Sequence, residues 1–263
     1  MSSLLQKGQF INFSNEYGLQ AVVGKTDGRK PVSNIISPPW SSIVKLSITG
    51  RYTDNIIGTG FFIETGIIAT AAHCIQSNIL SGKAEKITIE GISENNSSFS
   101  LTLKNPDKFH TPFFWDDDEH VNYDYGLIDL RDAGVKGIVN FHRPSEQNFE
   151  GYLANIAGFP VDLDRGNKML HHASAIDSIA SGEIRYRTDT GAGQSGGPIW
   201  CYTDTESNTP YLIGIHVQKG YSHVNEQANI YSDTRAKAIF VDNIGVALNN
   251  TFFSFLEEIK SMH

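Results

Sequence analysis

Three short motifs in this sequence each place one reactive side chain among small or apolar neighbours. His73 lies in TAAHC, Asp124 opens the run DYGLIDL, and Ser195 lies in GQSGGP. A histidine can take the proton of a serine hydroxyl, and an aspartate can hold that histidine in one tautomer. Together, these side chains have the chemistry needed to attack a carbonyl carbon and hydrolyse an amide.

The glycines around the serine meet a further need of that chemistry, which is a set of donors for a developing oxyanion. Gly193, Gly196 and Gly197 let the backbone bend, so that two N–H groups can point at one spot. Each motif alone also has a common structural explanation, as a strand end, a turn or a glycine-rich loop. The three motifs together, in the order His, Asp, Ser, favour the catalytic interpretation.

The elements that must position these residues are predicted to be short strands. The runs SSIVKLSI, IGTGFFI, GIIATAAH, KITIEGI, YGLIDL and LIGIHV are rich in β-branched and aromatic residues and are separated by turn residues. This pattern is typical of an all-β barrel or sandwich and not of alternating strands and helices. His73 and Asp124 each lie at one end of such a run.

The C-terminus is the exception to the β pattern. Phe252, Phe253, Leu256, Ile259 and Met262 recur at helical spacing in TFFSFLEEIKSMH. This spacing predicts one amphipathic helix that packs its apolar face on the rest of the protein. Membrane binding is disfavoured because the polar face carries two glutamates and a single lysine.

Composition argues against several other classes of function. The net charge is −8, and nucleic-acid binding needs a basic face, so we expect no nucleic-acid partner. No run reaches the roughly 18 apolar residues of a membrane span, so we expect no membrane partner. The acidic run WDDDEH lacks the spacing of a calcium loop, and the sequence contains no CxxC pair. We therefore expect no metal and no cofactor.

In order and context, the three motifs resemble those of the chymotrypsin-like serine proteases, over about residues 22–256. The resemblance implies two antiparallel six-stranded β-barrels with the active site between them, and a C-terminal helix. His73 would then be the general base, Asp124 would hold its tautomer, and Ser195 would be the nucleophile. The backbone N–H groups of Gly193 and Ser195 would form the oxyanion hole.

Further motifs are similar to those of the bacterial glutamyl endopeptidases. They are TDTxxGQSG, the Asp-Tyr-Gly start of the aspartate strand, GIH at residues 214–216 and IAGFP at residues 156–160. The stretch VVG, followed by Asp27 and Arg29, resembles the start of their mature chains, with a freed amine near the substrate pocket.

The resemblance divides the chain into four parts. Residues 1–21 would be an N-terminal extension or removable pro-segment, residues 22–140 the first barrel, residues 141–242 the second, and residues 243–263 the packed helix. We expect a protein or peptide substrate and a monomeric enzyme.

Two features depart from trypsin-type enzymes. Gln194 replaces the aspartate with which trypsin-type zymogens capture a new N-terminal ammonium, so that ion-pair switch cannot operate here in the same form. Cys74 and Cys201 are the only cysteines, and we expect two half-buried free thiols instead of a disulfide framework.

The same features bear on where the protein acts. The start MSSLLQKGQFINF lacks the charged region and long apolar core of a secretory signal. We therefore expect secretion by a route without a cleaved signal peptide. The alternative is action in a cytosolic, reducing compartment, which a protein without disulfides would survive.

The residues just before the serine are predicted to line the specificity pocket, and they favour two different substrate side chains. Asp189 alone favours a basic substrate side chain at P1, as in trypsin. Thr190 and His216 supply donors for a carboxylate instead, and His216 can carry positive charge when an acid binds. With the glutamyl endopeptidase resemblance, this favours Glu, or Asp, at P1, and trypsin-like cleavage after Arg or Lys is the alternative.

A hypothesis from another class is a catalytically inactive, protease-like binding protein. Such proteins usually lose a member of the triad. His73, Asp124 and Ser195 are all present, so we favour the enzyme.

Overall fold

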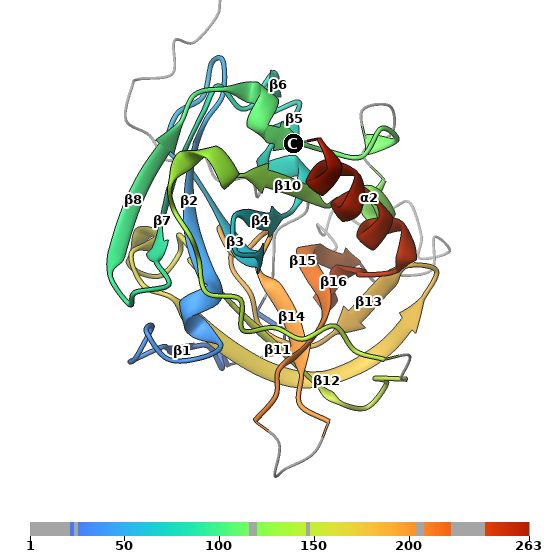
Figure 1. The fold of residues 1–263 in the computed structure, drawn as a ribbon. Coiled ribbons are helices and arrows are strands. Elements are labelled where there is room, and N and C mark those ends of the chain that lie inside the picture. The colour runs from blue at the N-terminus through green and yellow to red at the C-terminus, as the bar shows by residue number, and fades with distance from the viewer. Residues whose placement is uncertain are drawn as a thin grey trace, which may run out of the picture.

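The computed structural model describes residues 22–23, 26–115, 120–145, 148–203, 208–221 and 240–262. Two antiparallel seven-stranded sheets form the body of the structure, the first drawn from blue to green and the second mostly from yellow to red in Figure 1. The predicted all-β class with a C-terminal helix is confirmed. The predicted pro-segment, residues 1–21, lies outside the described residues.

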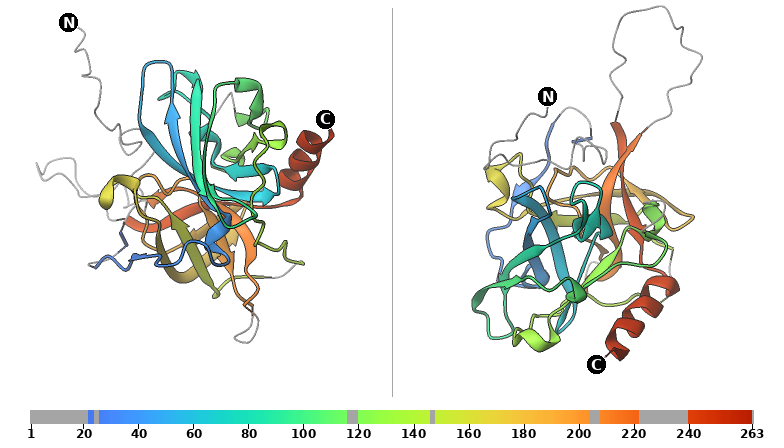
Figure 2. Two further views of the ribbon diagram at one scale, coloured as in Figure 1. Left: turned by 60° about the vertical axis from the view of Figure 1, so that its left-hand side comes forward. Right: turned by 90° about the horizontal axis from the view of Figure 1, so that it is seen from above.

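The N-terminal sheet is an open, curved half-barrel (Figure 2, left). Its seven strands, in spatial order, are β8 (Ser98–Leu103), β7 (Lys86–Ile92), β2 (Ile43–Thr49), β3 (Ile56–Glu64), β4 (Ile67–Thr70), β10 (Gly126–Asp129) and β9 (Phe109–His110). We predicted a six-stranded barrel for this half. The end strand β9 has only two residues, which leaves few backbone groups to pair across a closing seam.

The C-terminal strands form the predicted closed barrel. Their order is β1 (Lys30–Pro31), β12 (Leu170–Ala180), β11 (Leu153–Gly158), β14 (Pro198–Cys201), β15 (Tyr211–Tyr221), β16 (Phe240–Ala247) and β13 (Glu183–Tyr186). Because β13 also pairs with β12, six strands close on themselves and β1 extends the sheet outside the ring. The segment predicted as the terminal helix, residues 243–263, therefore begins inside β16.

Small elements complete the described chain. A two-stranded sheet pairs β5 (Gln76–Ser77) with β6 (Gly82–Lys83). The 3-10 turns are η2 (Trp40–Ser42), η3 (Ala72–Cys74), η4 (Pro106–Lys108), η5 (Val121–Tyr123), η6 (Arg131–Ala133) and η7 (Asp164–Gly166).

One main core joins the two halves. Ile43, Phe61 and Ile128 of the N-terminal sheet belong to the same buried cluster as Trp200 and Ile215 of the C-terminal barrel. Alternation along the strands explains this burial, since every second side chain of a strand points to the same face. The halves therefore share apolar packing, and the surface between them is fixed.

The predicted helix is α2 (Asn250–Ser261), which follows an N-cap residue, Asn249. The Asn249 side chain accepts from the N–H groups of Thr251 and Phe252. At the other end, the guanidinium of Arg131 donates to the carbonyl oxygens of Ile259 and Lys260, each at 2.7 Å. Both helix ends are therefore satisfied, and the C-terminal carbonyls meet a positive charge.

The apolar face of α2 is narrower than its spacing predicts. Phe252, Leu256 and Ile259 are buried, whereas Phe253 is partly exposed and Met262 is 54% exposed. Within the described residues, no helix has the length and apolarity to cross a membrane. The helix packs on the protein, as predicted.

The two cysteines are free, as expected from their number. Cys74 and Cys201 are completely buried instead of half-buried. Burial raises the pKa of the Cys201 thiol to about 12, so this thiol stays protonated near neutral pH.

Leu256→Ala tests the packing of α2. Because the leucine side chain is 3% exposed, we expect its truncation to lower the free energy of unfolding by about 2–5 kcal/mol. Glu258→Ala, on the exposed face, is the matched control and changes it by less than about 0.5 kcal/mol. Urea titrations measure both, and equal losses would contradict the described packing.

Candidate active site

His73 lies where strand β4 ends and the turn η3 begins. Its side chain is 2% exposed, and its ring Nδ1 lies 2.7 Å from Oδ2 of Asp124. The backbone N–H of His73 donates to the other oxygen, Oδ1, at 3.0 Å. The carboxylate therefore holds both the ring and the backbone of the histidine.

Strand register brings this aspartate to the histidine. Asp124 follows the turn η5 and precedes β10, and β10 pairs with β4 so that Gly126 is opposite Thr70. A Cβ on Gly126 would lie 2.6 Å from Cδ1 of Ile75 and 3.0 Å from the carbonyl oxygen of His110, so there is little room for a side chain here. The close approach of the strands sets the distance between Asp124 and His73.

Ser195 reaches the same place from the C-terminal barrel. Its carbonyl oxygen accepts from the N–H of Thr59 at 2.8 Å and lies 3.7 Å from Sγ of Cys74, the residue after His73. Ser195 is 3% exposed. Ser195 therefore lies at the interface of the two halves, in contact with the residue that follows His73.

The backbone around Ser195 aims two N–H groups in a defined direction. The carbonyl of Ala192 accepts from the N–H of Val161, and that of Gln194 accepts from Gly197. In a trans peptide the N–H points opposite to the C=O. The N–H groups of Gly193 and Ser195 therefore point away from these donors, as an oxyanion site requires.

Two of the predicted glycines are required by their geometry. Gly193 has φ +101° and Gly196 has φ +85°, which side chains other than glycine rarely adopt. A Cβ on Gly193 would collide with the carbonyl oxygen of Phe159, and one on Gly196 with Thr59 and Thr70. The serine turn therefore packs directly against its neighbours.

Asp189 is fully engaged by the N-terminal segment. Its carboxylate accepts from the N–H of Val23 at 2.6 Å and of Gly28 at 2.7 Å, and it is 2% exposed. Its own N–H donates to Nδ1 of His172 at 2.7 Å. The group that would attract Arg or Lys in trypsin-type enzymes is here a structural acceptor.

Thr190 and His216 present unsatisfied polar atoms. Both residues are at most 1% exposed. Over the described part of the chain, the hydroxyl of Thr190 and Nε2 of His216 have no hydrogen-bond partner. Buried polar atoms are almost always paired, so such atoms are candidates for ligand contacts.

His216 adjoins the serine turn through its backbone. Its N–H donates to the carbonyl of Gly197, and its carbonyl accepts from the N–H of Gly196. Burial and the charge of His73 lower the pKa of His216 to about 3, so its ring is neutral at ordinary pH. Nδ1 lies 2.5 Å from the hydroxyl of Tyr186.

Tyr186 is a residue that the sequence did not reveal. It lies in the run GEIRYRT, where nothing distinguishes it from other strand aromatics. Burial, with a contribution from the charge of Asp242, raises its pKa well above the usual range, so the phenol stays protonated. It can therefore donate to Nδ1 of His216, which leaves the proton of the neutral ring on Nε2.

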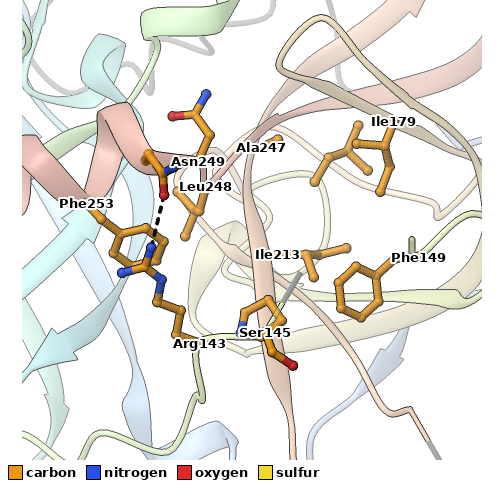
Figure 3. A pocket seen from close by; sticks show the side chains of 12 residues that line it. Arg143, Ser145, Phe149, Ile179, Ile213, Ala247, Leu248, Asn249 and Phe253 are labelled. Atoms are coloured by element: carbon orange, nitrogen blue, oxygen red, sulfur yellow. Dashed lines mark hydrogen bonds between the residues drawn. The ribbon is translucent and has the colours of Figure 1, made fainter. Parts of the chain in front are cut away.

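Metal-binding groups and a cavity near α2 were two further candidates for a site. Among the residues that the structure describes, no group of three or more His, Cys, Asp or Glu side chains is placed to hold a metal ion. Most of the acidic run WDDDEH, residues 116–119, lies outside them. A cavity of about 290 Å³ between α2 and the barrel (Figure 3) is lined by Arg143, Ile213 and Phe253 and by none of the predicted site residues.

Comparison with protein families gives the class. A family model described as a trypsin-like peptidase domain matches residues 58–207. The chain belongs to the trypsin-like peptidase family, and within it lies near the glutamyl endopeptidase branch of the chymotrypsin-like serine proteases. The resemblance predicted from the motifs is confirmed.

Two curated relatives carry different names. An extracellular metalloprotease of Bacillus subtilis is 30% identical over 207 residues, which are 77% of this chain and 64% of that protein. A glutamyl endopeptidase of Bacillus licheniformis is 27% identical over 210 residues, which are 78% of this chain and 63% of that protein. The chain thus spans less than two thirds of the length of either relative.

Solved structures share the fold. The structure of a Glu endopeptidase in complex with MPD matches this chain with a TM-score of 0.68 at 20% sequence identity. The match covers 92% of this chain and 100% of the endopeptidase chain. The protease Anisep from Arthrobacter nicotinovorans has a TM-score of 0.57 at 14% identity, with 86% and 96% covered. At these identities the likeness shows the architecture alone.

Titration of the two imidazoles tests the electrostatics of the site. Burial alone lowers the pKa of His73, but the charge of Asp124 and the contact with Cys74 outweigh it, and the pKa is raised well above its usual value. We expect NMR to show His73 titrating above about 6.5 and His216 staying neutral to about pH 3. In Asp124→Asn the pKa of His73 falls, because the charge that stabilises the imidazolium is gone. A pKa that does not move would contradict the pairing.

Proposed function

We propose that the protein is a serine endopeptidase that uses Ser195 as nucleophile, His73 as general base and Asp124 as the group that orients the base. The observation that carries this proposal is the pair of hydrogen bonds that Asp124 accepts from the backbone N–H and the ring Nδ1 of His73, beside a turn that contains Ser195. Hydrolysis by an acyl-enzyme needs this arrangement of groups.

The proposed reaction has two halves. Oγ of Ser195 attacks the substrate carbonyl while Nε2 of His73 takes its proton, and the N–H groups of Gly193 and Ser195 stabilise the oxyanion. His73 then protonates the leaving amine as the C–N bond breaks. A water molecule then attacks the acyl-enzyme while His73 takes its proton. His73 returns this proton to Oγ of Ser195 as the ester C–O bond breaks, which releases the acid and restores the serine.

In the proposed reaction, Asp124 fixes the tautomer of His73 and raises its pKa. Its carboxylate accepts from Nδ1 of His73, so the lone pair of the neutral ring lies on Nε2. It also stabilises the imidazolium that forms during attack. Because this raises the pKa of His73, activity increases as the pH rises through that pKa and the base loses its proton.

Covalent labelling tests the proposed nucleophile. We expect a fluorophosphonate to label the protein and abolish peptide hydrolysis, and Ser195→Ala to lose labelling and to lower kcat by about 10⁶. The Bacillus subtilis relative is named a metalloprotease, so EDTA is the second arm. Full activity in EDTA supports the serine mechanism. Loss of activity in EDTA, with no labelling of Ser195, would contradict it.

We propose further that the P1 side chain is an acid, Glu or Asp. Thr190 and His216 offer a hydroxyl and a ring nitrogen that are buried and unpaired in the described structure. Asp189 is bound to the N-terminal segment, which argues against cleavage after Arg or Lys. The name of the Bacillus licheniformis relative agrees with this choice.

Tyr186 would prepare the histidine for this role. As a neutral phenol it donates to Nδ1 of His216, so Nε2 carries the proton and can donate to a carboxylate. A bound acid would also favour the charged form of the ring and raise its pKa from about 3. A side chain without these acceptors leaves two buried donors unpaired, which is the cost that gives selectivity.

A panel of peptides that differ only at P1 tests the pocket. We expect preferred cleavage after Glu, and we expect Thr190→Val to lower kcat/KM for Glu by about tenfold to a hundredfold, because a hydrogen bond to a charge is lost. Thr102→Val, at an exposed threonine of β8, is the matched control and leaves it unchanged. Preferred cleavage after Arg or Lys would overturn the acidic P1 assignment.

A further inference from the structure

Residues 22–23 and 26–29, the described part of the N-terminal segment, lie against the turn that precedes Ser195. Asp189 accepts from two of its backbone N–H groups, those of Val23 and Gly28. Gly28 packs on the ring of His172, since a Cβ there would collide with Nε2 of that ring. His172 in turn accepts from the N–H of Asp189 at 2.7 Å. Asp189, at the start of the turn, is therefore held by this segment and by His172 of β12.

Arg29 is the buried charge of the segment. Its side chain is 1% exposed, and its guanidinium donates to Asp27 at 2.7 Å and to Asp162 at 2.6 Å. Asp27 is a near neighbour in the chain, but Asp162 belongs to the loop that follows β11. A buried guanidinium without its carboxylates would be an uncompensated charge, so the three residues hold each other in place.

The ion pair of Arg29 and Asp162 packs directly against the backbone of Gly191. A Cβ on Gly191 would collide with Nη1 of Arg29 and would lie 2.5 Å from Oδ1 of Asp162. Next to Asp162, the N–H of Val161 donates to the carbonyl of Ala192. That carbonyl determines where the N–H of Gly193 points, so the ion pair adjoins the backbone that aims the oxyanion donor.

Gln194 completes the turn without any charge. Its side-chain Oε1 accepts from the N–H of Gly191 at 2.8 Å, and its backbone N–H donates to the carbonyl of Gly191. Gln194 thus closes the turn by its two hydrogen bonds to Gly191, and Arg29 packs against Gly191 from outside the turn. A cation within the chain lies close to the turn that an N-terminal ammonium orders in trypsin-type enzymes.

We propose that Arg29, paired with Asp162, is a positioning residue that holds the turn from Gly191 to Ser195 in the shape needed for oxyanion binding. Val23, Gly28 and Arg29 thereby form a built-in support of the active site. Its effect on catalysis rests on the proposed serine endopeptidase function, whereas its effect on the order of the turn does not.

Hydrogen exchange of the turn, measured by mass spectrometry on the full chain, is the first test. In Arg29→Gln we expect faster exchange in peptides that span residues 189–195. Lys168→Gln is the matched control, because it breaks the ion pair with Asp164 at 3.1 Å, in the same region of the chain but on the surface. We expect exchange of the turn in this control to equal that of the wild type.

Kinetics on a peptide substrate is the second test. Because the oxyanion forms only during reaction, we expect Arg29→Gln to lower kcat by about tenfold to a hundredfold, with KM changed less than about twofold. Arg29→Lys keeps the charge but not the two-pronged geometry, so we expect it to restore part of kcat. Asp162→Asn removes one of the two carboxylates from a half-exposed position, and it decides the matter if Arg29→Gln does not fold.

The outcomes separate the two proposals. Unchanged exchange of residues 189–195 in folded Arg29→Gln and Asp162→Asn overturns the support role, and so does an equal change in Lys168→Gln. A wild-type protein that a fluorophosphonate does not label overturns the proposed function, while the exchange result still decides on Arg29. Faster exchange with a loss confined to kcat supports both.

Discussion

The arrangement of the site depends above all on the hydrogen-bonded pair of His73 and Asp124. Two ionisable side chains are buried at 2.7 Å, and neither is stable there without the other. Their approach depends on the pairing of β4 with β10, on the close packing around Gly126, and on the 3-10 turns that follow β4 and precede β10. The half-barrel therefore positions the proposed general base, and α2 packs beside it, with Phe252 against Tyr125.

The proposed nucleophile, Ser195, is positioned by the other half, because it comes from the closed barrel. The serine turn is held by contacts from three directions, which are Thr59 of the first sheet, the loop after β11 and the segment that begins at Val22. Glycines at 193 and 196 allow these contacts at backbone distance. The geometry of the site is thus a property of the interface between the halves and not of either half alone.

Electrostatics separates the two histidines near the serine. His73 faces a carboxylate, which raises its pKa and suits it to take a proton. His216 is buried beside a neutral phenol and near His73, and its pKa is lowered to about 3. The two imidazoles therefore differ in charge: Asp124 stabilises the cation of His73, whereas the ring of His216 is neutral at ordinary pH.

The sequence by itself determined the features that rest on local pattern. The reactive motifs, the strand-rich class and the helix around Leu256 follow from residue type and spacing, which act over a few residues. Tertiary structure alone decided that Asp189 binds the N-terminal segment, that Tyr186 meets His216 and that Arg29 supports Gly191. The contact of Gly28 with Asp189 joins positions 161 residues apart, that of Tyr186 with His216 joins positions 30 apart, and that of Arg29 with Gly191 joins positions more than a hundred apart. No periodicity or local propensity in the sequence indicates such contacts. The openness of the first sheet was likewise hidden, because closure depends on whether distant edge strands have enough backbone to pair.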